Sequence, residues 1–209
     1  MNQNVENQQG AELKQEISLE ALKAGDMAEF ARLVDAYSNN IYRVALKILS
    51  DPQDAEDVLQ ETFLKALRAL PSFEGRSSLS TWLYRIAVNE ALMLVRKRRS
   101  NFVSIDVDRE DDESEIEPIE IVDWCCLPEG DLLGAEARQF LDTAVQHLSP
   151  ALRAVFVLRD LEGLSVKETA DALNLTETAV KTRLLRARLK LREELSVYYA
   201  ERMSERFSK

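Results

Sequence analysis

Apolar residues recur at spacings of three and four along two long parts of this chain, a period that predicts amphipathic helices rather than strands. In the first part the period runs over residues 30–49 and again over residues 58–70. A third helix is expected from about Leu79 or Ser80 to Arg99, a length of roughly 30 Å at about 1.5 Å per residue. No stretch shows the alternation of a half-buried strand, so this part is predicted to be helical throughout.

Short polar residues and prolines mark where these helices begin and end. Asp26 is expected to cap the first helix, with Glu29 three residues later as its reciprocal partner. Residues 50–52 (Ser-Asp-Pro) end that helix and start the next, because proline is favoured at the first helical position. Pro71 is expected to end the second helix.

The second part, from residue 134 onwards, also begins its helices at polar residues. Ser149 and Pro150 form a cap-plus-proline start, and Glu162 with Gly163 breaks the helix that follows. No alternating pattern interrupts this series, so the second part is predicted to be helical as well.

A short helix, a tight turn and a longer helix come next, which is the order of a helix-turn-helix motif. Ser165 and Glu168 are spaced as a capping box for the short helix. Asn174 is expected to be left-handed in the turn, and Thr176 to cap a long helix towards Leu195. Small or apolar residues occupy the expected packing positions: Ala170, Leu173, Leu175, Val180 and Leu184.

Charge is distributed unevenly along the chain. The 209 residues are 45% hydrophobic and 31% charged, and their net charge of −10 argues against a nucleic-acid partner. However, residues 1–100 carry a net charge of −1, residues 101–133 of −11 and residues 134–209 of +2. The acidic segment has too few apolar residues to offset chain entropy, so it is expected to be a flexible linker.

These patterns together predict an all-α fold, with two small helical domains joined by a flexible acidic linker. The expected parts are a polar N-terminal arm (1–18), a first domain (19–100), the linker (101–133), a second domain (134–200) and a C-terminal tail (201–209).

Several classes of protein are not expected. No apolar run approaches the roughly 20 residues of a membrane span, and the polar start has no signal-peptide core. Adjacent Cys125 and Cys126 cannot build a disulfide framework, which favours a reducing, cytoplasmic compartment. With His147 as the one histidine, they also lack zinc-ligand spacing. No nucleophile–base pair or glycine-rich phosphate loop appears, so neither an enzyme nor a cofactor is expected.

The long helix of the helix-turn-helix carries a basic stripe. From Thr178 to Arg192 there are six basic residues and no acidic one. Such a helix can enter the major groove, where arginine and lysine reach guanine edges and phosphates. The alternative is a solvated amphipathic helix, but the capping box, turn and packing positions in register favour DNA binding.

The first domain has a candidate nucleic-acid surface of its own. Its last helix ends in four basic residues, 96–99, which can hold phosphates, although a basic helix end is also stabilised by the helix dipole. Trp82 and Tyr84 lie beside basic residues, an arrangement that suits stacking of single-stranded bases. The alternative is a place in the core, which is expected for at least one aromatic residue.

Two blocks of the sequence resemble a known family. Three stretches are similar to region 2 of the bacterial extracytoplasmic-function (ECF) RNA polymerase sigma factors: residues 54–63 (DAEDVLQETF), 73–77 (FEGRS) and 81–89 (TWLYRIAVN). Residues 150–188, including VKTRLLRAR at 180–188, resemble region 4 of the same family. The resemblance covers about residues 20–100 and 134–198, in the family's order.

The resemblance implies an alternative sigma factor that binds core RNA polymerase, recognises promoter DNA and promotes strand opening. It implies docking on the polymerase clamp helices by Asp54, Asp57, Gln60 and Glu61. It implies capture of a flipped base and the opened minus-ten strand by Phe73, Arg76, Trp82, Tyr84, Asn89, Arg96, Lys97, Arg98 and Arg99. It implies reading of the minus-thirty-five duplex by Thr176, Thr178, Lys181, Thr182, Arg183, Arg186 and Arg188.

The family also implies an anti-sigma protein as a further partner, with no membrane insertion and no small-molecule substrate. For Asp54, Asp57 and Glu61, the alternative to docking is compensation of the helix dipole together with solvation, and it applies most to Asp54. The sequence departs from the family's pattern at residues 178–179 (Thr-Ala, where Gly-Thr is common), at Leu79 (commonly aromatic) and at Met93 (commonly acidic). These departures leave the fold intact, but the promoter sequence cannot be copied from relatives.

Two rival functions are left open by the residues alone. One is a DNA-binding regulator that acts as a dimer, which would need a dimerisation face or sensor domain. The other is an interaction protein that occupies polymerase without contacting DNA. The acidic linker likewise has two interpretations, a nucleic-acid mimic inside polymerase channels or a spacer that keeps the basic faces from misbinding.

Overall fold

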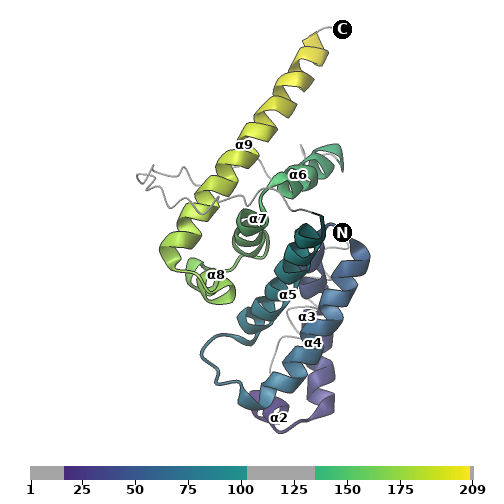
Figure 1. The fold of residues 1–209 in the computed structure, drawn as a ribbon, viewed down its shortest axis with the longest axis vertical. Coiled ribbons are helices and arrows are strands. Elements are labelled where there is room, and N and C mark those ends of the chain that lie inside the picture. The colour runs from purple at the N-terminus through teal and green to yellow at the C-terminus, as the bar shows by residue number, and fades with distance from the viewer. Residues whose placement is uncertain (1–16, 103–134, 208–209) are drawn as a thin grey trace, which may run out of the picture. The chain divides into compact units, whose positions relative to one another are not determined.

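The computed structural model describes the backbone of residues 17–102 and 135–207, and the side chains of residues 17–98 and 140–196. Every regular element in these ranges is helical (Figure 1). The chain divides into two compact units, one holding most of α2–α5 and the other most of α6–α9. The predicted all-α class with two helical units is therefore confirmed. Cys125, Cys126 and the acidic segment from 103 to 133 lie outside the described residues.

Three long helices build the first unit. Its elements are α2 (Leu19–Lys23), α3 (Met27–Leu49), α4 (Pro52–Ala69), the 3₁₀ turn η1 (Leu70–Ser72) and α5 (Leu79–Phe102). Helix α3 covers the period predicted for it, α4 ends at Ala69 and leaves Leu70 to η1, and α5 begins at the predicted residue but continues past Arg99. Sequence reasoning missed α2, because a five-residue helix is too short to show a period.

The start of α3 confirms one half of the predicted cap and corrects the other. Asp26 accepts hydrogen bonds from the backbone N–H groups of Ala28 at 2.8 Å and Glu29 at 3.2 Å, as expected of an N-cap. The Glu29 carboxylate does not return to Asp26, so the reciprocal half of the prediction was wrong. The backbone N–H of Asp26 already donates to the carbonyl of Ala21 at 3.0 Å, and Glu29 instead accepts from Ser18 at 2.6 Å.

The core of the first unit lies where α3 packs on α4 and α5 closes over both. Its members are apolar residues that recur at helical spacing: Leu33, Ile41, Val44, Ile48, Val58, Leu70, Leu83 and Val88. Two polar contacts join α5 to its neighbours. The Asn40 side chain donates to the Tyr84 hydroxyl at 3.2 Å, and Lys65 Nζ lies 2.6 Å from Glu90 Oε2. These contacts fix which face of α5 remains open to solvent.

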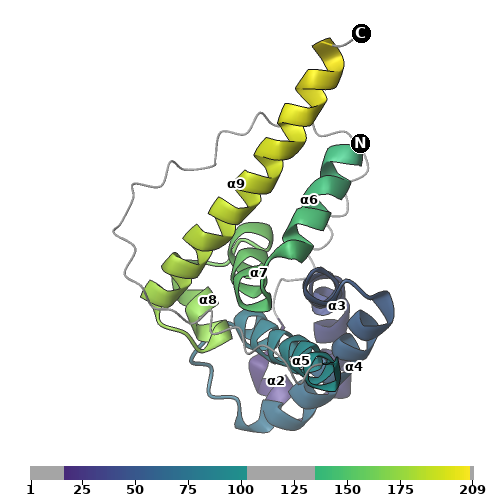
Figure 2. The ribbon, with the colours of Figure 1, turned by 45° about the horizontal axis from the view of Figure 1, so that its top comes forward.

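The second unit is assembled around one long helix. Its elements are α6 (Ala135–His147), α7 (Pro150–Phe156), the π turn η3 (Val157–Leu161), α8 (Val166–Leu173) and α9 (Glu177–Phe207). Both α6 and α7 pack against α9, and the C-terminal end of α9 projects beyond α7 and α8 (Figure 2). The helix α6 was not predicted, and α9 extends to Phe207 rather than ending near Leu195.

Local capping fixes the helix-turn-helix. The N–H of Ser165 donates to the Glu168 carboxylate at 2.9 Å and the N–H of Glu168 donates to Ser165 Oγ at 3.1 Å, which confirms the capping box. Asn174 has a φ of 54°, and Thr176 Oγ1 accepts from the N–H of Ala179 at 3.1 Å, both as predicted. The cap predicted at Ser149 is only positional, because its side chain makes no capping hydrogen bond.

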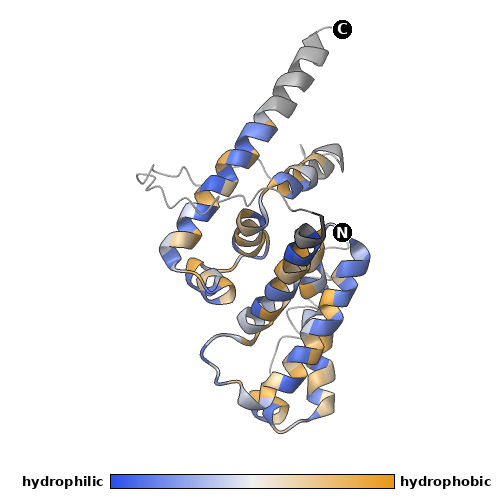
Figure 3. Ribbon diagram, viewed as in Figure 1, coloured by the Kyte–Doolittle hydropathy of each residue, from blue (hydrophilic) through white to orange (hydrophobic). Residues whose placement is uncertain are grey.

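Hydrophobic and hydrophilic residues alternate around the described helices, as expected of elements that each bury one side (Figure 3). Among the residues that the structure describes, no helix has the length and apolar character needed to cross a membrane.

Candidate nucleic-acid interface

The last helix, α9, turns one side inward and presents the opposite side to solvent. Val180, Leu184, Ala187 and Leu191 are buried at alternating spacings of four and three. At about 100° per residue, positions 178, 182 and 186 fall on the other side of the helix, and positions 181 and 183 flank the buried stripe. Thr178 and Lys181 are exposed, and Thr182, Arg183 and Arg186 are half-buried. This side is the candidate DNA face of α9.

Two residues predicted for this face also stabilise the structure. Thr176 caps α9 through its hydroxyl oxygen. Arg188 makes a two-pronged ion pair with Asp160 of η3, with Nε–Oδ2 and Nη2–Oδ1 distances of 2.9 and 2.8 Å, and both side chains are only 18% exposed. The planar guanidinium suits this geometry. Arg188 therefore links η3 to α9, and its predicted contact with DNA stays a prediction.

The loop of residues 73–78 joins η1 to α5. At its start the Phe73 side chain is buried, and its ring centroid lies 4.8 Å from that of Trp82. At its end Ser78 Oγ accepts from the N–H of Thr81 at 3.1 Å and so caps α5. Between these anchors, Glu74, Gly75 and Arg76 are exposed, and Arg76 pairs with Glu74. The loop thus projects a charged tip from two fixed ends.

The aromatic residues predicted for the minus-ten strand divide between surface and core. Trp82 is half-buried, with Phe73 packed beneath it. Tyr84 is only 5% exposed, and its hydroxyl bonds Asn40. Direct stacking of bases on Tyr84 does not fit that burial, and the core alternative foreseen for at least one aromatic residue applies to it.

Further along α5, the polar residues face solvent. Asn89, Arg96, Lys97 and Arg98 are exposed. The side chain of Arg99 lies outside the described residues. The exposed charges share the last described turns of one helix, where they add up to a local positive potential suited to phosphates.

Helix α4 carries a second exposed surface. Asp57 and Gln60 are exposed, Glu61 is half-exposed with Lys65 Nζ 3.6 Å away, and Leu64 is an exposed leucine at 47%. These four residues share one side of α4, because they are spaced by three and four positions. Asp54 is half-buried in the first turn, where its N–H donates to the Asp51 cap, so helix-dipole compensation fits it as well as docking does.

No group of three or more potential metal ligands occurs among the residues that the structure describes. His147 is the last residue of α6, and its Nδ1 lies 3.0 Å from Glu194 Oε2 on α9.

An all-helical chain whose helix-turn-helix offers a basic, solvent-facing side belongs to the helix-turn-helix class of DNA-binding proteins. Two family models match it and narrow the class: Sigma-70 region 2 over residues 33–101, and Sigma-70, region 4 over residues 138–191. Among curated relatives, the ECF RNA polymerase sigma factor SigW of Bacillus subtilis is 33% identical over 177 residues, covering 85% of this chain and 94% of the relative. The chain belongs to the ECF RNA polymerase sigma factors.

Other relatives agree. The ECF RNA polymerase sigma-E factor of Escherichia coli strain K12 is 35% identical over 180 residues, which is 85% of this chain and 92% of that protein. The structure of CnrH in complex with the cytosolic domain of CnrY matches with a TM-score of 0.62 and 25% identity, over 86% of this chain and 95% of that one. The sigma factor RpoE in complex with the anti-sigma factor NepR, from Bartonella quintana, matches with a TM-score of 0.58 and 28% identity, over 81% and 98%.

The protein is thus an alternative sigma factor, which binds core RNA polymerase, recognises promoter DNA and promotes strand opening to initiate transcription. Sigma factors as a class act by binding and are not enzymes.

Proposed function

We propose that the second unit reads the minus-thirty-five duplex through the exposed side of α9. The observation that carries this assignment is that Lys181, Arg183 and Arg186 lie outside the buried stripe of α9, with Lys181 exposed and the two arginines half-buried. Thr178, Lys181, Thr182, Arg183 and Arg186 supply the donors that the major groove and its phosphates accept. Thr176 and Arg188 support them by capping α9 and by tying it to η3.

The first unit holds the opened minus-ten strand in the same proposal. Arg76 on the loop tip, Trp82 and Asn89 are the exposed or half-exposed groups able to reach an unpaired base. The basic residues 96–99 attract the phosphates that follow. Phe73 and Tyr84 act indirectly, by supporting Trp82 and by fixing α5 to α3.

The exposed side of α4 docks on core polymerase. The polar contacts come from Asp57, Gln60 and Glu61. Leu64, which is exposed to water in the free protein, adds an apolar contact. Asp57→Lys should weaken core binding by about tenfold or more, since like charges then oppose each other across the interface. Asp35→Lys makes the same charge change at an exposed position of α3 and is the matched control. Equal loss in both variants would exclude this side of α4 as the docking surface.

An anti-sigma protein is the further partner that we propose. The similar structures CnrH and RpoE were solved in complex with the cytosolic domain of CnrY and with the anti-sigma factor NepR. An inhibitor of this kind is expected to cover the α4 or α9 surfaces that polymerase and DNA need. In the proposed function the protein acts in the cytoplasm and has no catalytic activity of its own.

The decisive experiment is transcription in vitro with core polymerase and genomic DNA, with mapping of the start sites. New start sites that share two sequence elements at constant spacing are expected. Their absence would contradict the proposal.

Charge reversal on α9 separates the rivals. Arg183→Glu with Arg186→Glu should abolish promoter-specific starts, while core binding is retained. Lys23→Glu, on exposed α2, controls for the change of charge. Unimpaired transcription by the reversed variant would favour an interaction protein that occupies polymerase without DNA, and specific DNA binding by a dimer without polymerase would favour the regulator.

A further inference from the structure

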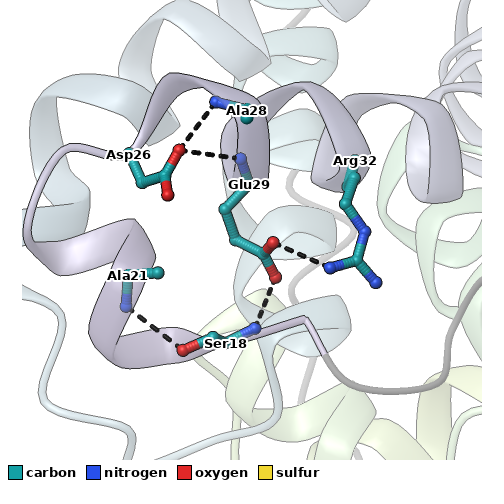
Figure 4. A network of polar contacts seen from close by, with 6 residues as sticks. All are labelled: Ser18, Ala21, Asp26, Ala28, Glu29 and Arg32. Carbon is teal, nitrogen blue, oxygen red and sulfur yellow. Dashed lines mark hydrogen bonds and ion pairs between the residues drawn. The ribbon is translucent and has the colours of Figure 1, made fainter.

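A polar network at the start of the first unit ties two separate segments together (Figure 4). The Glu29 carboxylate, whose side chain is only 10% exposed, accepts from the backbone N–H of Ser18 at 2.6 Å and from Arg32 Nη1 at 2.8 Å. Capping of α3 does not need this carboxylate, because Asp26 already fills that role. The Glu29 carboxylate therefore holds Ser18, eleven residues earlier in the chain.

Ser18 in turn begins α2. Its hydroxyl oxygen accepts from the N–H of Ala21 at 3.2 Å, as the N-cap of this helix. A helix of five residues has no stability of its own in water. The place of α2 is therefore set by its anchors, which are the bond from Ser18 to Glu29 and the buried Leu22.

Helix α2 packs on η1, which leads directly into the loop of residues 73–78. A Cβ atom placed on Gly75 would lie 3.9 Å from Leu19 Cδ2, so the Leu19 side chain lies against the loop tip. Gly75 has a φ of +74°, a left-handed conformation that glycine adopts without strain. The two loop ends are fixed by Phe73 and Ser78, and Leu19 supports the stretch between them.

We propose that α2, anchored by Glu29, sets the position of the loop of residues 73–78 and so controls capture of the minus-ten base. Leu19 and Glu29 are positioning residues in this account, and neither contacts DNA. The inference rests on the proposed role of this loop in base capture. Its physical basis is preorganisation: a loop tip held by Leu19 before DNA arrives does not have to be ordered during strand opening.

The test uses the full chain assembled with core polymerase, on a promoter whose captured minus-ten base is replaced by 2-aminopurine. The fluorescence of this base rises when it leaves the stack, so it reports capture directly. Leu19→Ala should slow the rise by about 5-fold or more, the lower end of the coupling usually found between sites. Affinity for core polymerase and for the minus-thirty-five duplex should stay unchanged. Lys23→Ala, on the exposed side of the same helix, should behave as wild type.

Variants of Glu29 test the same proposal independently. Glu29→Ala removes the acceptor for Ser18 and should slow capture in the same way, whereas Glu29→Gln keeps an oxygen acceptor and should restore most of the rate. Thermal unfolding separates positioning from folding. Leu19→Ala with slow capture, normal core binding and near-normal unfolding supports the inference, and loss of core binding in proportion to slow capture overturns it.

A double-mutant cycle with Arg76→Ala on the loop tip identifies the route. If Leu19 acts through the loop, the combined variant is impaired less than the product of the two single effects. Effects that multiply independently would overturn the inference. If Arg76→Ala and a strained Gly75→Val both leave capture unchanged, the proposed role of the loop itself fails. If they impair capture and Leu19→Ala does not, only the positioning role of α2 fails.

Discussion

Glu168 and Ser165 satisfy each other's backbone N–H groups at the start of α8. The hydrogen bonds from the Ser165 side chain and backbone hold the pKa of the Glu168 carboxyl below its ordinary value of 4.5. A carboxyl whose pKa is lower in the folded than in the unfolded state stabilises the fold when it is ionised. Its stabilising effect is therefore present above the unfolded pKa and disappears as the pH falls through the folded pKa.

Glu168→Gln tests this effect, because glutamine keeps an oxygen acceptor and loses the charge. The wild type should be more stable than the variant by about 0.3–1 kcal/mol at pH 7, the usual gain from an anion at a helix start. This difference should shrink as the pH falls below 4.5. Urea unfolding of both proteins at pH 7 and at pH 3.5 measures it. A difference that does not change with pH would contradict the assignment.

Lys181 and Arg188 are basic residues of the same helix with different roles. Arg188→Ala should lower the free energy of unfolding by about 1.5–3 kcal/mol, because it leaves Asp160 without its two charge-assisted hydrogen bonds. Arg188→Lys should recover only part of this loss, since an ammonium group cannot reproduce the fork. Lys181→Ala should change stability by less than about 0.5 kcal/mol.

For the salt dependence of DNA binding, Lys181→Ala should have a larger effect than Arg188→Ala. Lys181→Ala should reduce the slope of log K against log salt for promoter duplex by about one, the effect of one lost phosphate contact. Equal changes of slope in Lys181→Ala and Arg188→Ala would show that Arg188 leaves Asp160 when DNA binds.

Two junctions between helices depend on residues in the left-handed conformation. Ser50 (φ 61°) ends α3 and Asn174 (φ 54°) ends α8, so each lets the chain turn directly into the next helix. A left-handed conformation costs an ordinary residue about 1–2 kcal/mol, and glycine avoids the clash.

Ser50→Gly is therefore expected to raise the free energy of unfolding by up to about 1 kcal/mol. Ser50→Val should lower it by about 1–2 kcal/mol, since a β-branched side chain fits this conformation worst. Asn174→Gly should be close to neutral, because asparagine already tolerates the conformation. Thermal unfolding of the three variants measures the order. A stabilising Ser50→Val would refute the explanation.

Over the whole molecule, charge is separated by segment. Of the chain's net charge of −10, residues 101–133 contribute −11, and the two parts that hold the helical units have net charges of −1 and +2. This acidic segment, which the sequence predicts to be a linker, carries the strongest charge opposing DNA, so its role must be tested in the assembled polymerase.

Replacing Asp111, Asp112, Glu113 and Glu115 by serine should alter the rate of open-complex formation or of promoter escape, if the linker acts as a nucleic-acid mimic. A variant with residues 106–120 in permuted order keeps the charge and serves as control. Initiation kinetics on one promoter measure both. Unchanged transcription by the serine variant would leave the spacer as the linker's role.

Capping residues explain why most helix starts could be predicted. The caps at Asp26, Ser165 and Thr176, and the left-handed turn at Asn174, involve atoms no more than three residues apart. The wrong predictions arose where no local pattern exists. Helix α2 is too short to show a period, and the Glu29 carboxylate accepts from Ser18 rather than from Asp26.

The candidate DNA site divides in the same way. The amino-acid sequence by itself determined that α9 has an apolar side and a basic side, that the acid is confined to one segment, and which motifs mark the family. Only the tertiary structure decided that Arg188 pairs with Asp160, 28 residues away, and that Tyr84 bonds Asn40, 44 residues away in the core. Helical period and capping depend on neighbours within one turn, whereas the partner of a buried polar group is set by which distant helices pack together.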